Sequence, residues 1–181
     1  MKRVVLAVIV CLFSVPAWAA DNSGTLLFSW EEGLQGWKLN NDPGPQAVSV
    51  TTGETGATDG KKALAVAMKD DYHLAAKLED PSVAQKLKNI VKLAVDVTAP
   101  EGSAQGFLQV TFAAVADGMP FSGADLQEVP ADGKPHTLSF DISAWKIPDQ
   151  PKYFVLWLVT NTAAKSKPGT IYFDNVRMQT K

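Results

Sequence analysis

Cysteine is almost absent from this chain. The sequence has one, Cys11, and it lies in an apolar run close to the start. Beyond that run there can be no disulfide and no cysteine-based metal centre, so the stability of the fold must come mainly from its core. Histidine is scarce too: His73 and His136 are the only two, and neither has a second His or a Cys at metal-ligand spacing.

Positive charge is sparse as well. Arg3 and Arg177 are the only arginines, and the formal net charge is −2. Loss of Lys2 and Arg3 with a leader would take that charge to −4. Without a basic patch, nucleic acid and anionic membrane surfaces are poor partners on electrostatic grounds. No stretch after residue 15 is long and apolar enough to span a bilayer.

The motifs of common hydrolytic and nucleotide-dependent enzymes are missing. There is no Gly-x-Ser-x-Gly elbow and no phosphate-binding loop. The acids are scattered: Asp70 and Asp71 share a turn, and Glu31 and Glu32 point in alternating directions. Because no pair of carboxylates suited to glycoside cleavage stands out, we expect that the protein is not an enzyme.

The first twenty residues have the pattern of a secretory leader. Lys2 and Arg3 precede an apolar run at residues 4–15, and Ala17-Trp18-Ala19 forms a small-residue cleavage site. We therefore expect residues 1–20 to be a removed signal peptide and the protein to be exported, to the periplasm or outside the cell. An uncleaved anchor is the alternative, and the well-formed cleavage site argues against it. Residues 21–181 are expected to form a single domain.

The rest of the sequence has the pattern of strands and turns. Apolar and polar residues alternate most clearly in 90–98, 107–114 and 153–160, the period of a strand with one buried face. Asp80-Pro81 predicts the start of one short helix at 82–88. Residues 116–134, rich in Gly and Pro, are the longest irregular stretch. Further strands are expected at 28–30, 47–50, 63–68, 72–78, 136–142 and 170–178, which together predict an all-β sandwich.

Two segments at opposite ends of this domain share one pattern. The segments 28–37 and 171–178 each place a carboxylate, Glu31 or Asp174, close to aromatic residues. A carboxylate buried beside aromatic rings needs a partner. We therefore expect the two ends of the domain to pair and to share one metal ion.

Four segments carry a resemblance to a known family. They are FSWEEGLQGW at 28–37, GKKALAV at 60–66, VPADGKPHTLSFDISAW at 129–145 and GTIYFDNVRM at 169–178. In this order they resemble the sequence signatures of carbohydrate-binding modules with a galactose-binding-domain-like jelly roll, although Pro135-His136 stands where that family often has a tryptophan. The resemblance implies an all-β jelly-roll β-sandwich. The segment 37–42 also resembles the complex I intermediate-associated family, which shares the fold, but it lacks that family's Gly-Gly after the Asp.

The resemblance also implies a structural calcium ion between the first and last strands. Glu31 and Asp174 match the family's carboxylate positions, and the carbonyl group of Lys61 matches a third ligand. Asp59 lies in the same loop as Lys61 and could add a fourth. Oxygen ligands of this kind suit calcium. The alternative is that Glu31 and Asp174 cap turns or bind backbone groups.

A candidate ligand surface follows from the outward residues of the predicted strands. Sugars stack on aromatic rings and bind planar polar groups through their hydroxyls. We expect Trp157, Gln109 and Asp96 to form such a surface. Phe107 and Tyr153 lie at further outward positions, and Tyr72 and Phe121 could form the rim. Alternatively, Phe107 and Trp157 simply pack beneath the stretch 116–134.

These observations predict a non-catalytic domain that binds a polysaccharide or another glycan outside the cytoplasm. Such a domain could work beside an associated extracytoplasmic enzyme or other protein. Two alternatives remain: a structural or protein-interaction module of the same fold without sugar binding, and a polysaccharide-cleaving enzyme.

Overall fold

The computed structural model describes residues 24–40, 47, 49–68, 72–103, 106–163 and 169–180. The expected leader lies outside these residues, as do the side chains of Tyr72, His73 and Leu74. Within the described part of the chain, no helix is long and apolar enough to cross a membrane.

The described residues form two antiparallel β-sheets and one short helix, α1 (Pro81–Leu87). Sheet A contains β1 (Thr25–Phe28), β3 (Ser49–Gly53), β4 (Ala63–Ala67), β6 (Ile90–Thr98), β10 (Pro135–Asp141) and β12 (Thr170–Thr180). Sheet B contains β2 (Trp37–Leu39), β5 (Tyr72–Glu79), β7 (Leu108–Ala116), β8 (Met119–Gly123), β9 (Gln127–Glu128) and β11 (Phe154–Thr162). The predicted all-β sandwich is therefore confirmed.

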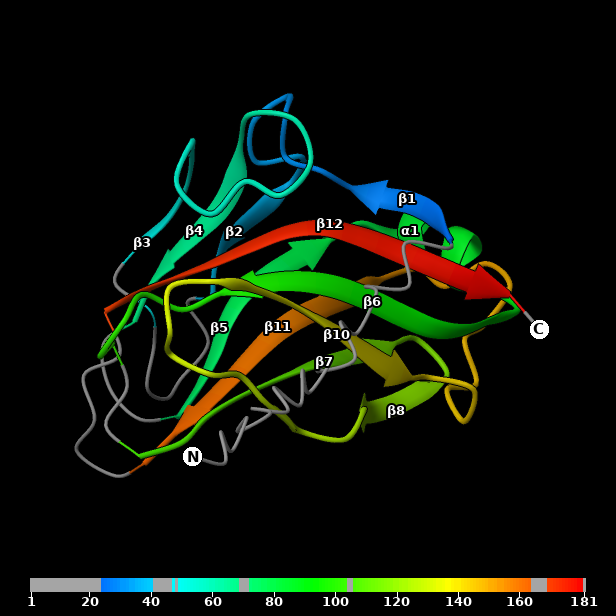
Figure 1. Cartoon of the computed structure of the whole chain (residues 1–181). Helices are drawn as coiled ribbons and strands as arrows, with labels where there is room; N and C mark the ends of the chain where they lie inside the picture. Colours follow the sequence, from blue (N-terminus) through cyan, green and yellow to red (C-terminus); the bar gives the residue numbers. More distant parts are fainter. Residues whose placement is uncertain are drawn as a thin grey trace, which may run out of the picture.

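β12, the last described strand in chain order, lies in the middle of sheet A. β12 pairs with β6 along one side, and with β4 and β1 along the other (Figure 1). Thr25 of β1 lies opposite Met178 of β12. The prediction that the two ends of the domain pair is confirmed. The register of β12 shifts between Asp174 and Arg177, and Asn175 in that bulge has a φ of 54°.

An aromatic cluster anchors the first strand to the core. The rings of Phe28, Trp30 and Trp37 lie 5.6–6.2 Å apart, and all three are buried. The predicted strand 28–30 ends at Phe28, because Trp30 turns to a φ of 56°. The side-chain oxygen of Gln35 accepts a hydrogen bond from the Trp30 amide at 3.0 Å, which holds this turn.

Strand alternation sorts the two faces of sheet B as the sequence predicts. In β11, Phe154, Leu156 and Leu158 belong to the core between the sheets. Trp157 and Val159 belong to a separate apolar cluster on the outer side. The same alternation places the inward side chains of β6 and β7 in the core, namely Leu93, Val95, Val97, Leu108, Val110 and Phe112.

The helix has the predicted cap and begins at Pro81, one residue before the predicted range 82–88. Asp80 is the N-cap, and its Oδ1 accepts a hydrogen bond from the Ser82 amide at 2.8 Å. Pro81 occupies the first helical position, where a missing N–H costs nothing. The helix ends at Leu87, one residue earlier than predicted.

Two segments predicted as turns or loops contain strands. The stretch 116–134 includes β8 and β9, which both pair with β7. Pro120 is tolerated because β8 lies at the edge of sheet B, where one side of a strand needs no partner. Trp37–Leu39, for which no strand was predicted, forms β2 by pairing with β5.

Candidate functional site

The outer side of sheet B carries a small apolar cluster around Trp157, one of the predicted ligand residues. Its centre is Trp157, which lies between Ala113 of β7 and Lys77 of β5 in the strand register. Val155 and Val159 flank it along β11. We call this surface the sheet-B face, defined by Gln109, Thr111, Ala113, Val115, Val155, Trp157, Val159, Asn161, Lys77, Glu79 and Phe121.

Two aromatic rings meet on the sheet-B face. The centroid of the Phe121 ring lies 5.7 Å from that of Trp157, and the rings are tilted by 46°. Trp157 is only 7% exposed, whereas Phe121 is 56% exposed. Phe121 is therefore the ring that solvent and a ligand can reach, and Trp157 supports it from the sheet.

A charged group borders one side of the face. Glu79 Oε1 lies 2.9 Å from the Lys77 ammonium group, and Glu79 Oε2 accepts a hydrogen bond from Lys38. The hydrogen bonds from Lys38 and then Lys77 hold the pKa of Glu79 below its usual value. This carboxylate is therefore ionised and engaged by two lysines.

Planar amides lie at one end of the same face. The Asn161 side chain donates a hydrogen bond to Gln109 Oε1 at 2.9 Å, from the neighbouring strand. Gln109 also lies opposite Glu128 of β9. Amide groups of this kind can bind the hydroxyl groups of a sugar while the ring contacts an apolar surface.

The other predicted ligand residues are spread along the sheet. Tyr153 and Phe107 are 50% and 40% exposed, and they precede β11 and β7 respectively. Because these two strands are antiparallel, the two rings lie at opposite ends of the pair. Tyr72 lies opposite Asn161 in the register of β5 and β11, but its side chain is outside the described part of the structure.

The structure does not bring Asp96 together with Trp157 and Gln109, so this expectation is corrected. Asp96 lies on β6, which belongs to sheet A and pairs with β10 and β12. Its carboxylate accepts hydrogen bonds from Arg177 at 2.9 Å and Thr137 at 2.6 Å. Strand alternation gave its outward direction correctly, but alternation does not reveal to which sheet a strand belongs.

The remaining Asp96 contacts bury it beneath a loop. Its Oδ2 accepts hydrogen bonds from the Thr58 hydroxyl group at 2.8 Å and from the Asn175 amide at 3.2 Å. The side chains of Asp96 and Arg177 are 8% and 4% exposed. Asp96 therefore acts as a structural group in this fold.

The expected metal residues Glu31 and Asp174 hold the same short loop, residues 58–62. Asp174 Oδ2 accepts hydrogen bonds from the backbone N–H groups of Thr58 at 2.7 Å and Asp59 at 2.9 Å. Glu31 Oε1 accepts two more, from Lys61 at 2.8 Å and Lys62 at 2.6 Å. The loop is thus tied to both ends of the domain.

Burial and hydrogen bonding act differently on these two carboxyl groups. Burial raises the pKa of Asp174 above its usual value, although hydrogen bonds from Asp59 and Thr58 oppose the shift. At Glu31, the backbone N–H groups of Lys62 and then Lys61 lower the pKa. A buried carboxylate with a raised pKa lacks full compensation for its charge, which a nearby cation would supply.

These donors suit calcium in kind, because calcium prefers carboxylate and carbonyl oxygens. Among the described residues, no three His, Cys, Asp or Glu side chains cluster closely enough to hold a metal. Ligands beyond Glu31 and Asp174 would therefore have to be backbone carbonyls, such as that of Lys61, or water. Asp59 is exposed, and it contributes its backbone N–H to Asp174.

Sequence reasoning missed two parts of the sheet-B face. Asn161 continues the outward alternation of Trp157 and Val159, so a longer predicted strand would have included it. The link between Lys77 and Glu79 follows from the same two-residue period in β5, where both residues point outward.

Comparison with known proteins gives a consistent picture of the fold. No family model matches the chain, and no curated protein matches it. Among solved structures, the CBM22-1 xylan-binding domain of Xyn10C from Paenibacillus barcinonensis superposes with a TM-score of 0.60 at 20% identity. The match covers 88% of this chain and 97% of that domain.

Two further structures show the same likeness. A CBM28 module specific for non-crystalline cellulose gives a TM-score of 0.63 at 14% identity, over 88% of this chain and 97% of that one. The family 11 module from Clostridium thermocellum, in complex with a β-1,3-1,4-mixed-linked tetrasaccharide, gives 0.56 at 12% identity, over 86% and 95% of the chains. The fold is therefore the β-sandwich jelly roll of carbohydrate-binding modules, as the sequence resemblance predicted.

Proposed function

We propose that this chain is a non-catalytic domain that binds a polysaccharide or another glycan on the sheet-B face. The observation that carries the proposal is the Phe121–Trp157 pair, in which an exposed ring lies 5.7 Å from a supporting ring on the outer face of the sandwich. The structural neighbours include modules described as binding xylan and cellulose. At identities of 20% or less these neighbours support the fold, and the binding itself rests on the face.

The chemistry of the sheet-B face suits a sugar ring. The C–H groups on one side of a pyranose ring pack against an aromatic ring. Phe121 offers such a ring, and the amides of Gln109 and Asn161 offer planar polar partners on the same sheet. Ligand contacts at Tyr153, Phe107 and Tyr72 would extend this surface towards the two ends of the strands.

The acids on this face do not favour catalysis. Glu79 accepts hydrogen bonds from two lysines that lower its pKa, the reverse of the shift that a general acid needs. This supports binding without cleavage. Release of reducing ends or unsaturated products from a polysaccharide would contradict it.

A protein-interaction module is the second candidate. The partly buried Val115 and Val155 pack against the buried Trp157 on this face. An apolar patch beside an exposed aromatic ring also suits a protein partner.

Co-sedimentation with insoluble polysaccharides tests the proposal. We expect the wild-type protein to bind at least one of xylan, amorphous cellulose or mixed-linked glucan, and Phe121→Ala to lose that binding. Leu26→Ala is the matched control, because Leu26 is a similarly exposed apolar side chain on sheet A. Absence of binding on these polymers and on a glycan array would favour the protein-interaction module.

The expected location belongs to the same proposal. Residues 1–20 are proposed as a removed signal peptide, which would deliver the domain to the periplasm or outside the cell, where an enzyme on another chain could act beside it. N-terminal sequencing of the exported protein tests this, with a start at Asp21 expected. A start at Met1 would contradict it.

A structural calcium ion is the last part of the proposal. Glu31, Asp174 and the carbonyl of Lys61 would hold it between the two ends of the domain. It is supported by the raised pKa of the buried Asp174 and by the shared loop 58–62. The hydrogen bonds from that loop are the alternative, since they already engage both carboxylates without a metal.

A further inference from the structure

Three aromatic rings are exposed in the described part of the chain. The side chains of Phe121, Tyr153 and Phe107 are 56%, 50% and 40% exposed, and every other aromatic ring that the structure describes is less exposed than these. Phe121 lies in β8, and the other two directly precede β11 and β7. Single exposed apolar side chains are ordinary, but several on one face of a sheet are typical of an interaction surface.

Backbone hydrogen bonds extend the ladder between β7 and β11 to Tyr153 and Phe107. The Asp117 amide donates to the Tyr153 carbonyl at 3.3 Å, just beyond one end of the paired strands. The Ala163 amide donates to the Phe107 carbonyl at 3.2 Å, just beyond the other end. Strand alternation therefore continues through both residues, and it places their side chains on the same side of sheet B as Trp157.

Phe121 completes a line of three rings along the outer side of sheet B. Its ring lies 5.7 Å from that of Trp157, which is between the two ends in the β11 register. Tyr153 and Ala163, the partner of Phe107, are ten residues apart, so the line is roughly 30 Å long at about 3.3 Å per residue. A single sugar ring is much shorter than this line. The surface is therefore long enough for several consecutive sugar units.

Polar side chains lie between two of the rings. The Asn161 amide donates to Gln109 Oε1 at 2.9 Å, between Trp157 and Phe107 in the strand register. A hollow of about 260 Å³ opens beside Phe107, with Glu128 in its lining. Planar polar groups of this kind can bind the hydroxyl groups of successive sugars while the sugar rings pack on aromatic surfaces.

Across the strands, the described side chains form no such line. On one side of Trp157, β5 carries Lys77, whose ammonium group lies 2.9 Å from Glu79. On the other side, Ala113 of β7 and then Gly123 of β8 follow in the register. A glycan crossing the sheet at this row would meet one pair of rings and then an ion pair already formed within the protein. The rings therefore favour a glycan that runs along the strands.

We propose that an extended polysaccharide chain binds along β7 and β11, over the sheet-B face and the two rings beyond its ends, Tyr153 and Phe107. This proposal rests on the glycan binding proposed above, and it adds the direction and the length of the bound segment. Phe121, supported by Trp157, contacts the middle of the segment. A short oligosaccharide cannot reach all three exposed rings at once, so affinity increases with the number of sugar units.

Isothermal titration calorimetry with oligosaccharides of increasing length tests this proposal. The probes are xylo-oligosaccharides, cello-oligosaccharides and mixed-linked gluco-oligosaccharides of two to six units. We expect at least one series to bind with an affinity that rises up to the hexasaccharide. Tyr153→Ala and Phe107→Ala should each weaken the hexasaccharide by roughly two- to tenfold, the effect of one aromatic contact, and leave the disaccharide unchanged. Phe121→Ala should weaken both.

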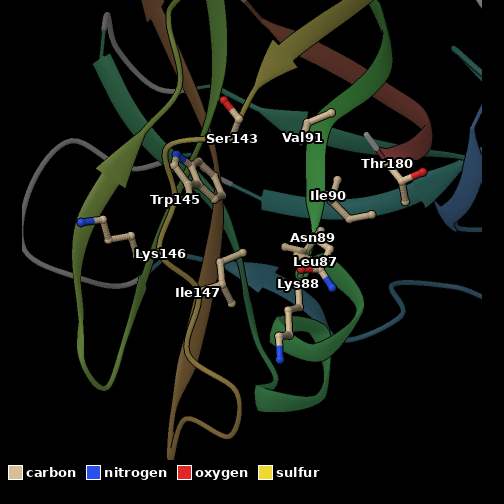
Figure 2. A pocket seen from close by; sticks show the side chains of 10 residues that line it. All are labelled: Leu87, Lys88, Asn89, Ile90, Val91, Ser143, Trp145, Lys146, Ile147 and Thr180. Atoms are coloured by element: carbon tan, nitrogen blue, oxygen red, sulfur yellow. The ribbon is translucent and has the colours of Figure 1, made fainter.

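Matched variants separate ring contacts from damage to the fold. Tyr153→Phe and Phe107→Tyr keep a ring at each end and should retain the affinity for the hexasaccharide. Trp145 lines a cavity of about 450 Å³ between the end of α1 and the loop after β10, and this cavity shares no residue with the sheet-B face (Figure 2). Trp145→Ala should therefore leave hexasaccharide binding unchanged, with thermal melting to check that the variant is folded.

Failure of this proposal is distinguishable from failure of glycan binding itself. Equal affinities for the disaccharide and the hexasaccharide, or full hexasaccharide affinity in both end variants, would overturn the proposal while glycan binding stands. Loss of hexasaccharide binding in a folded Trp145→Ala variant would also overturn it, because the glycan would then lie in the cavity. If the wild type binds none of the three series, the proposed function is contradicted, and this proposal with it.

Discussion

The two outer faces of the sandwich use opposite chemistry. On sheet A, the buried Asp96 carboxylate is occupied by Arg177, Thr137, Thr58 and Asn175. On sheet B, Trp157 lies among small apolar side chains, and its aromatic neighbour Phe121 is exposed.

This difference suggests that the outer side of sheet A mainly stabilises the fold, whereas the sheet-B face is the surface open to a ligand. The Asp96 carboxylate on sheet A is engaged by contacts within the protein, one of them from Thr58 in the loop 58–62. On the sheet-B face, the Phe121 ring is exposed beside the buried Trp157. Variants at Asp96 on sheet A should therefore lose stability and keep glycan binding. Variants at Phe121 on the sheet-B face should lose glycan binding and keep most of their stability.

The largest effect is expected at Asp96. Asp96→Ala removes a buried carboxylate that accepts a hydrogen bond from the buried Arg177 guanidinium, which should lower the free energy of unfolding by about 3–5 kcal/mol. Urea-induced unfolding measures this loss. Glycan binding by the protein that remains folded should be unchanged.

A double variant provides the control. Asp96→Leu combined with Arg177→Met removes both charges, and it should recover much of the lost stability. A loss below about 1 kcal/mol for Asp96→Ala would show that the ion pair contributes little, as exposed pairs do.

Calcium removal should have the next largest effect. A metal that binds only the folded state stabilises it by about 2.7 kcal/mol at a hundred times its dissociation constant. Chelation should then lower the melting temperature by several degrees, and Glu31→Gln and Asp174→Asn should each abolish that response. Glu32→Gln, a change at an exposed neighbour, should retain it. A melting curve indifferent to calcium and to chelator would leave the backbone hydrogen bonds as the whole role of Glu31 and Asp174.

Phe121→Ala should change stability less than either of these. The side chain is 56% exposed, and an aromatic pair contributes about 0.5–1.5 kcal/mol beyond the area it buries, so the unfolding free energy should fall by about that amount plus the small contribution of the buried part of the ring. Thermal melting in parallel with co-sedimentation checks whether binding is lost while the fold persists. A loss of several kcal/mol would instead identify Phe121 as a packing residue.

The smallest effect is a pH dependence at Glu79. Its pKa is lowered in the folded state, so the stability it contributes is present above the unfolded value of about 4.5 and is lost as the pH falls through the folded value. The melting temperatures of wild type and Glu79→Gln should therefore differ most near neutral pH and converge in acid. A difference that persists unchanged in acid would exclude ionisation of Glu79 as its cause.

Local patterns in the sequence predicted the strands and their directions well. The alternation of Phe154, Leu156 and Leu158 with Trp157 depends only on the two-residue period of a strand, and the helix start depends on Asp80 and Pro81. Strand alternation and helix capping both depend on residues that are close in sequence. The sequence alone therefore predicted these two features.

The assignment of strands to sheets could not be predicted in the same way. β6 precedes β7 in the chain, yet β6 pairs with β10 and β12 in sheet A while β7 pairs with β8, β9 and β11 in sheet B. Asp96 was therefore expected beside Trp157 and lies on the other sheet. Phe121 was expected only at the rim, because Pro120 and Gly123 predict a loop. The edge strand β8 forms there through its pairing with β7.

The central place of β12 has a consequence for the newborn chain. Among the described strands it is the last to be synthesised, and its partners β6, β4 and β1 all precede it. Until Thr170–Thr180 has emerged from the ribosome, these three strands present open edges where β12 will lie, and open edges pair readily with other chains. A chain that lacks β12 should therefore aggregate more readily, because β12 closes all three edges.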